Sequence, residues 1–146
     1  GLLKMELTGK RLKVRENKGI RVLDDSYNAA PDSVKSAIKT METTGSKRRI
    51  AILGAMNELG DDTPKHHYEV GTYAADHRID LVIGIEPKAK DIVRGAVDGG
   101  TKGIYFDKKE DLYPHLKEIL KDGDLVLTKA SMTRHFWEIA DEIMNL

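Results

Sequence analysis

Cysteine is absent from this chain, which excludes a disulfide scaffold, a thiolate metal site and a cysteine nucleophile. No apolar run approaches the roughly 20 residues of a membrane span. The first residues also lack the pattern of a signal peptide, in which a charged segment is followed by an apolar one. Because 24 basic residues match 24 acidic ones, the basic surplus typical of nucleic-acid binding is also missing. We therefore expect a cytoplasmic protein that neither spans a membrane nor binds nucleic acid.

What is present fits one globular domain with a packed core, since the chain has 146 residues and 40% of them are apolar. The zero net charge hides an imbalance. Residues 1–50 carry 12 basic and 6 acidic side chains, and residues 51–146 carry the remaining 12 basic and 18 acidic ones. The basic surplus of the first segment is compatible with a single nucleotide as ligand.

Short apolar runs alternate with longer amphipathic stretches along the chain. The runs are Ile20–Leu23, Ile50–Leu53, Leu81–Ile85, Ile104–Phe106 and Leu125–Leu127. Their unalternated Ile, Val and Leu residues are typical of parallel strands that are buried on both faces. The amphipathic stretches predict helices over Pro31–Thr43, from Thr63, from Pro87, over Asp111–Leu120 and from about Thr133 to Met144.

Strand and helix alternate five times, which predicts an α/β fold. We expect a Rossmann-like three-layer domain whose mostly parallel sheet has about six strands and is flanked by helices. Arg11–Arg15, the turn at Asn17–Gly19 and the run from Ile20 predict an N-terminal hairpin at the edge of the sheet. Residues 1–8 are predicted to be a connector.

Ligands of open α/β sheets bind beyond the carboxyl ends of the strands, so the first loop, Asp24–Pro31, is the leading candidate site. Asp24 and Asp25 could accept from a ribose hydroxyl or hold a metal. Asn28 suits an adenine edge or an amide, and Tyr27 could stack on a ring. The alternative is a turn in which Asp or Asn caps the helix that starts at Pro31.

The last strand is followed by Lys129, which could meet a phosphate or a carboxylate, and by Ser131, which could cap the final helix. The adjacent pair His66-His67 lacks the i, i+4 spacing of a metal pair on a helix. Gly99–Gly103 precedes a strand, whereas a phosphate-binding loop must follow one. Without a Walker A motif, the chain lacks the usual means to hold and split ATP alone.

Three of these loops resemble motifs of the Mur ligase family. Asp24–Ser33 is similar to the signature Asp-Asp-Ser-Tyr-Asn-Ala-Asn-Pro, and Ile52–Gly60 is similar to Leu-Gly-Asp-Met-x-Glu-Leu-Gly. Leu127–Ser131 resembles Val-Lys-Gly-Ser, and His67 and Gly71 also agree. Upstream, Leu7-Thr8 and Arg11 resemble the segment that joins the central and C-terminal domains of the family.

The resemblance implies that residues 9–146 are the C-terminal domain of a three-domain ligase and that residues 1–8 arrive from its central ATPase domain. Such an enzyme activates a carboxylate as an acyl phosphate and joins it to an amine. The members most similar to this chain add D-Ala-D-Ala to UDP-N-acetylmuramoyl-tripeptide in peptidoglycan synthesis. ATP and Mg²⁺ would be held mainly by the central domain. The partners would be the protein's own N-terminal and central domains, in a monomer.

By this resemblance the domain closes over ATP and positions the incoming amine, and it contributes no catalytic residue and no metal ligand. Arg11 and Asn28 would lie near the base and phosphates, and Asp25 near the ribose. Tyr27, Lys129 and Ser131 would face the cleft where the dipeptide arrives. The isolated domain is expected to be inactive.

The chain departs from the family motifs at Ala30, Ala55 and Ala130, and residues 132–137 do not follow the usual Arg-x-Met pattern. A Mur-ligase-like enzyme that joins a different acid and amine is therefore an alternative. A non-catalytic nucleotide-binding module is another.

A phospho-receiver domain is the alternative from a different class. Asp24-Asp25 and Lys129 resemble its acidic pair and its lysine. However, a receiver needs an aspartate at the end of its middle strand, where this chain has Gly84 and Glu86.

Overall fold

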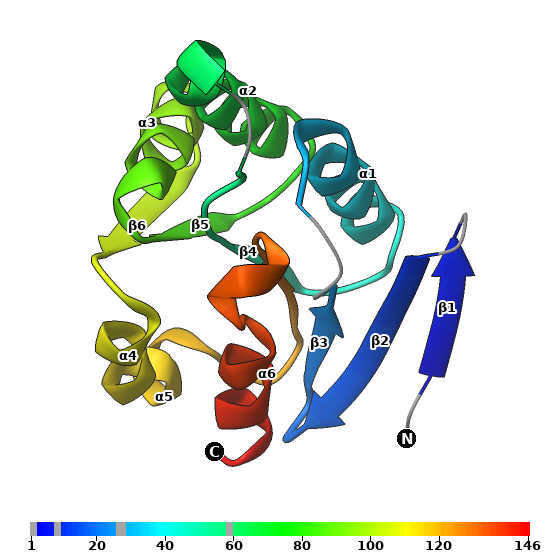
Figure 1. Ribbon diagram of the computed structural model, residues 1–146. Coiled ribbons are helices and arrows are strands. Elements are labelled where there is room, and N and C mark those ends of the chain that lie inside the picture. The colour runs from blue at the N-terminus through cyan, green and yellow to red at the C-terminus, as the bar shows by residue number, and fades with distance from the viewer. Residues whose placement is uncertain (1–2, 8–9, 26–28, 58–59) are drawn as a thin grey trace.

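The computed structural model describes residues 3–7, 10–25, 29–57 and 60–146 (Figure 1). Its strands are β1 (Leu3–Leu7), β2 (Lys10–Asn17), β3 (Ile20–Asp24), β4 (Arg48–Leu53), β5 (Leu81–Ile85), β6 (Lys102–Phe106) and β7 (Asp124–Lys129). Its α-helices are α1 (Pro31–Glu42), α2 (Thr63–Asp76), α3 (Lys90–Asp98), α4 (Lys109–Leu112), α5 (Leu116–Ile119) and α6 (Trp137–Met144). Short 3-10 turns are η1 (Gly60–Asp62), η2 (Pro87–Ala89), η3 (Tyr113–His115) and η4 (Met132–Arg134).

All seven strands form one sheet in the order β1-β2-β3-β7-β4-β5-β6. The strands from β3 to β6 in this order are parallel, and β1 and β2 add an antiparallel edge. Lys18 and Gly19, both with positive φ, form the turn between β2 and β3, as in hairpins whose turn twist matches that of the strands. The predicted α/β fold and its edge hairpin are confirmed.

Alternate residues of each parallel strand face two separate cores. In β4, Ala51 and Leu53 pack under α1, α2 and α3, whereas Ile50 and Ile52 pack against α4, α5 and α6. Figure 1 shows the two groups of helices on opposite sides of the sheet. Burial on both faces explains why the strands read as continuous apolar runs rather than as alternating ones.

Two predicted helices are shorter or broken in the structure. The stretch Asp111–Leu120 forms α4, η3 and α5 in place of one helix, and Pro114, which has no N–H to donate, lies inside η3. The last helix begins at Trp137 rather than near Thr133. His135 just before it has φ 56°, a left-handed conformation that cannot continue an α-helix.

The segment predicted to be a connector contributes a seventh strand. Leu3–Leu7 form β1 and pair with β2, with Glu6 opposite Arg11. The sheet therefore has one strand more than the six expected. That this segment arrives from a central ATPase domain stays a prediction.

The strand order excludes a phospho-receiver. Numbered along the chain, the five parallel strands β3, β4, β5, β6 and β7 lie in the order 1-5-2-3-4 across the sheet. Receiver domains have the flavodoxin-like order 2-1-3-4-5. The last strand of this chain lies between the first and the second, so the receiver alternative is wrong.

Candidate functional site

The carboxyl ends of the five parallel strands form one edge of the sheet. Residues 129–135, from the last residue of β7 onward, contact the ends of other strands there. Asp25 follows β3 and contacts Lys129. Asn57, beyond β4, contacts Ser131, while Glu86 follows β5 and pairs with Arg134. Because β7 is central in the sheet, its loop can reach strand ends on both sides. This edge is the candidate site.

Asp25 and Lys129 form a buried ion pair on this edge. The Lys129 ammonium donates to Asp25 Oδ2 at 2.7 Å. The Lys129 side chain is 0% exposed and the Asp25 side chain is 7% exposed. The backbone N–H of Asp25 donates to the Thr128 carbonyl, which fixes the carboxylate beside β7. Asp25 Oδ1 is buried without a hydrogen-bond partner among the described residues. A buried carboxylate oxygen of this kind can accept a donor from a ligand.

Asp24 has a different environment from its neighbour. Thr128 Oγ1 lies 3.4 Å from Asp24 Oδ1, in hydrogen-bond contact. Burial raises the pKa of the Asp24 carboxyl, and the nearby Arg15 partly opposes this rise. The two aspartates therefore bind different partners. Among the described residues, no group of three or more His, Asp or Glu side chains could hold a metal ion.

The helix-cap alternative for the first loop finds no support in the part of the chain that the structure describes. The N-cap of α1 is Ala30, and its N–H donates to Ser33 Oγ at 3.0 Å. Ser131 does not cap the last helix either, because Phe136 is the N-cap of α6.

Ser131 instead joins two loops of the site. Its N–H donates to the Ala55 carbonyl at 3.0 Å, and its Oγ accepts from Asn57 Nδ2 at 2.9 Å. The Gly54 N–H donates to the Lys129 carbonyl at 3.0 Å. A Cβ at Gly54 would lie 2.7 Å from that of Ala130, so the close approach of the loops requires glycine there. These contacts hold the loops after β4 and β7 as one unit.

His67 anchors the same unit to α2. Its ring is fully buried and accepts the Met56 N–H at Nε2, at 3.0 Å. Nδ1 therefore carries the proton and donates to the Thr63 carbonyl at 2.7 Å. Burial lowers the pKa of His67 below its usual 6.5. The neutral ring thus fixes the loop after β4, which explains a histidine here without any metal.

The neutral state of His67 predicts that acid destabilises the fold. The unfolded chain takes up a proton near pH 6.5, and the folded chain does so only at lower pH. The contribution of the neutral His67 ring to the free energy of unfolding is therefore complete above about pH 6.5. It is lost as the pH falls through the pKa of the folded state, by at most about 1.4 kcal/mol per pH unit. We expect a steeper loss in the wild type than in His67→Gln, measured by urea unfolding between about pH 7.5 and about pH 5.5. Equal slopes would contradict the neutral, buried ring.

At the far end of the edge, Glu86 and Arg134 form an ion pair with Oε1 and Nε 3.4 Å apart. The Lys109 ammonium donates to the Arg134 carbonyl at 2.8 Å and also pairs with Glu138. These charged residues were not among the predicted site residues. Because they follow three different strands, no single motif in the sequence contains them.

The sequence-predicted residues fall into two groups. Asp25, Lys129 and Ser131 lie together on the carboxyl edge, within the contacts just described. Arg11 belongs to β2, but its side chain lies outside the described residues, as do Tyr27 and Asn28 entirely. The binding roles assigned to all six residues stay predictions.

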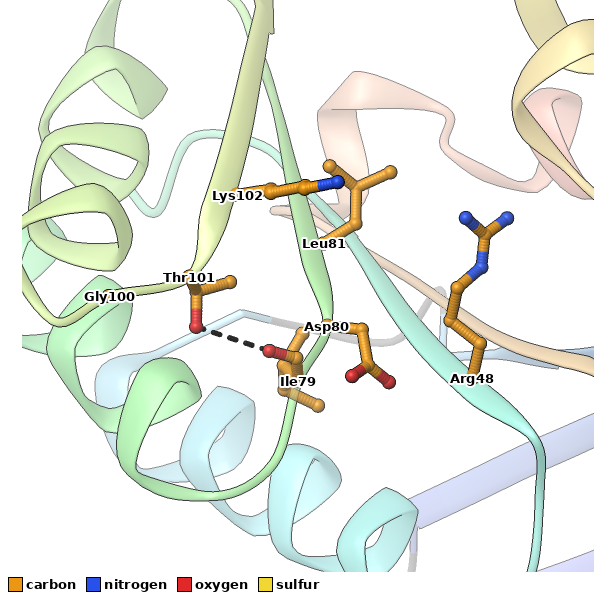
Figure 2. A pocket seen from close by; sticks show the side chains of 7 residues that line it. All are labelled: Arg48, Ile79, Asp80, Leu81, Gly100, Thr101 and Lys102. Atoms are coloured by element: carbon orange, nitrogen blue, oxygen red, sulfur yellow. Dashed lines mark hydrogen bonds between the residues drawn. The ribbon is translucent and has the colours of Figure 1, made fainter.

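A hollow of about 440 Å³ lies at the opposite, amino-terminal edge (Figure 2). It is lined by Arg48, Ile79, Asp80, Leu81, Gly100, Thr101 and Lys102. The Arg48 guanidinium already bonds both oxygens of the buried Asp124, at 3.0 and 2.7 Å. Figure 2 shows Leu81 between Arg48 and Lys102, so the two cations do not converge. We therefore place the candidate site on the carboxyl edge.

No helix in the described ranges is long and apolar enough to cross a membrane. The family model for "Mur ligase, glutamate ligase domain" matches residues 10–132. The UDP-N-acetylmuramoyl-tripeptide–D-alanyl-D-alanine ligase of Bacillus subtilis is 33% identical over 149 residues, which cover 99% of this chain and 33% of that protein. The ligase of the same name from Synechocystis is 32% identical over 84% of this chain and 27% of its own length. The chain thus spans about a third of these relatives.

Solved structures show the same similarity. MurF ligase from Thermotoga maritima, in complex with ADP, superposes with a TM-score of 0.75 at 28% identity, over 90% of this chain and 30% of that one. MurF from Acinetobacter baumannii gives a TM-score of 0.83 at 22% identity, over 92% of this chain and 30% of that one. The second comparison supports the fold alone.

Proposed function

Because the chain belongs to the Mur ligase family, as a glutamate ligase domain, we propose that it is the C-terminal domain of an ATP-dependent amide ligase. The complete enzyme would join UDP-N-acetylmuramoyl-tripeptide to D-Ala-D-Ala in peptidoglycan precursor synthesis, with release of ADP and phosphate. The similarity to ligases of that name over 99% and 84% of the chain supports this choice of substrates. Joining a different acid and amine is the alternative outcome.

The observation that carries the proposal is the buried Asp25 carboxylate on the carboxyl edge. Oδ2 is held by Lys129, and Oδ1 has no hydrogen-bond partner among the described residues. That orphan acceptor suits a hydroxyl donor such as those of a ribose, so the residues present fit a nucleotide. ATP would supply the phosphoryl group that activates the carboxylate substrate. Arg11 and Asn28 are proposed to contact the base and phosphates.

Lys129 and Ser131, with Tyr27, are proposed to form the side of the site that the dipeptide approaches. Ser131 links the loops after β4 and β7, and Lys129 is locked onto Asp25. Such a linked edge can move as one rigid body onto a central domain. Orienting an amine against an activated carboxyl group contributes up to about 7–11 kcal/mol to lowering a barrier. Exclusion of water from the closed site protects the activated acid from hydrolysis.

Mg²⁺ and most contacts to the triphosphate are assigned by this proposal to a central domain of the complete enzyme. The proposal gives this domain no metal ligand because, in the family it belongs to, the central domain carries the Mg²⁺ ligands. The domain partners and a monomeric state are likewise part of the proposal.

The test is to express the complete reading frame that encodes this chain and, separately, the 146-residue chain. With ATP, UDP-N-acetylmuramoyl-tripeptide and D-Ala-D-Ala, we expect the complete protein to form the pentapeptide product and ADP in equal amounts. Liquid chromatography with mass spectrometry measures both. The 146-residue chain alone is expected to form neither. Robust ATP turnover by that chain, or a reading frame without an ATPase domain, would overturn the proposal.

A further inference from the structure

Arg134 combines accessibility with a fixed position on the carboxyl edge. Lys129 is fully buried against Asp25, and Lys109 is engaged by the Arg134 carbonyl and by Glu138. The Arg134 side chain, in contrast, is 37% exposed. A ligand that reaches this edge can therefore contact the Arg134 guanidinium without breaking the buried pair.

Glu86 holds the guanidinium from one side only. Arg134 Nε and Glu86 Oε1 face each other at 3.4 Å, and both atoms are buried without a hydrogen bond. Within the described ranges, the guanidinium donates no hydrogen bond to any residue. Its two terminal nitrogens thus remain available as a planar pair of donors. This fork matches the two oxygens of a carboxylate, which arginine binds in a bidentate manner.

The backbone of Glu86 is strained. Its φ of 78° and ψ of 157° lie in a region that is populated almost only by glycine. Hydrogen bonds on both sides keep it there, from the Glu86 N–H to the Phe106 carbonyl and from the Ala89 N–H to the Glu86 carbonyl, each 2.9 Å. A glycine at this position would remove the strain. The glutamate that stands here instead places its carboxylate beside Arg134.

The loop that carries Arg134 is strained as well. His135, the next residue, has φ 56°, and its ring stacks on Trp137 with centroids 4.4 Å apart. Lys109 Nζ donates to the carbonyls of Arg134 and His135, at 2.8 and 3.3 Å. Strained backbone therefore occurs at one partner of the ion pair, Glu86, and at the residue that follows the other partner, Arg134. Such strain is concentrated at ligand-binding sites.

We propose that Arg134, oriented by Glu86, binds the free carboxylate of the acceptor substrate, the compound whose amine is acylated. This inference rests on the function proposed above and adds a specificity-determining residue to it. Glu86 acts through Arg134 and is a positioning residue. The arrangement favours amines that also carry a free carboxylate.

The test compares D-Ala-D-Ala with its C-terminal amide as acceptors of the complete enzyme. Arg134→Ala is expected to lower kcat/KM for the acid by on the order of 10- to 100-fold, as for loss of a charged hydrogen-bonded contact. Turnover of the amide and the KM for ATP should be unchanged, and Arg134→Lys should recover part of the preference for the acid. Arg94→Ala is the matched control, because Arg94 is an exposed arginine of α3 that pairs with Asp91.

Equal losses on the acid and the amide would show that Arg134 only supports the structure, which would overturn the inference. A wild-type enzyme that is inactive on both acceptors would instead overturn the proposed function. Glu86→Gly provides a second test, since it relieves the strain and removes the carboxylate together. We expect its melting temperature to exceed that of Glu86→Ala, with the preference for the acid reduced in both. An undiminished preference in Glu86→Gly would contradict the positioning role.

Discussion

Lys129→Met is expected to lower the free energy of unfolding by about 3–5 kcal/mol, because it leaves the Asp25 carboxylate buried without its counter-ion. The lysine side chain is 0% exposed and donates to Asp25 Oδ2 at 2.7 Å. Water therefore cannot replace the ammonium unless the carboxyl edge opens. Urea unfolding of the chain, followed by circular dichroism, measures the loss.

A double variant separates the stranded charge from lost packing. Lys129→Met combined with Asp25→Asn removes both charges, and we expect it to be more stable than Lys129→Met alone. Lys117→Met is the matched control, because Lys117 is exposed on α5, and its effect should stay within about 0.5 kcal/mol. If Lys129→Met were as stable as this control, the pair would not be buried in solution.

Gly71→Ala is expected to destabilise the fold by on the order of 3 kcal/mol, because α2 and α3 touch backbone to backbone at this residue. A Cβ at Gly71 would lie 2.0 Å from the carbonyl oxygen of Ile92 and 2.7 Å from the nitrogen of Ala96. Neither atom belongs to a side chain that could rotate away, so the helices must separate. The separation would also loosen the core between these helices and the sheet.

Gly95 offers an internal check, since a Cβ there would lie 2.2 Å from the Tyr68 carbonyl oxygen on the facing helix. One separation of the helices would accommodate both new methyl groups. The double variant should therefore lose less stability than the sum of the losses in Gly71→Ala and Gly95→Ala. Gly45→Ala is the control, because nothing lies within 4 Å of the position that its new methyl group would take. Thermal unfolding of the wild type and the four variants measures these losses, and a Gly71→Ala variant as stable as the control would refute the close helix contact.

Local patterns predicted most of the elements correctly. The apolar runs around Ile50–Leu53 and Leu81–Ile85 lie within β4 and β5, because strands buried on both faces need apolar side chains at every position. Pro31 begins α1, since proline fits the first turn of a helix. The last helix starts at Trp137 and not at Thr133, because His135 has a left-handed backbone conformation. Lys109, which comes 26 residues earlier, donates to the His135 carbonyl, and this contact could not be predicted from local sequence.

The candidate site was predictable in part. The motifs that resemble the Mur ligase family led to Asp25, Lys129 and Ser131, and the structure places all three on one edge. The contacts among them were not predictable from those motifs, because Asp25 and Lys129 are 104 residues apart in the chain. Glu86 and Arg134 were missed for the same reason, since they too lie far apart in the chain and no single motif contains both.

By itself, the sequence determined the α/β class, the alternation of strands and helices and the family, since these depend on residue type and local spacing. Only the tertiary structure decided that β7 lies between β3 and β4. That position buries Lys129, at the end of β7, against Asp25 after β3. It also lets the loop after β7 extend past β4 to the end of β5, where Arg134 lies beside Glu86. Local periodicity records which face of a strand is buried, but the choice of neighbouring strand depends on packing across the whole sheet.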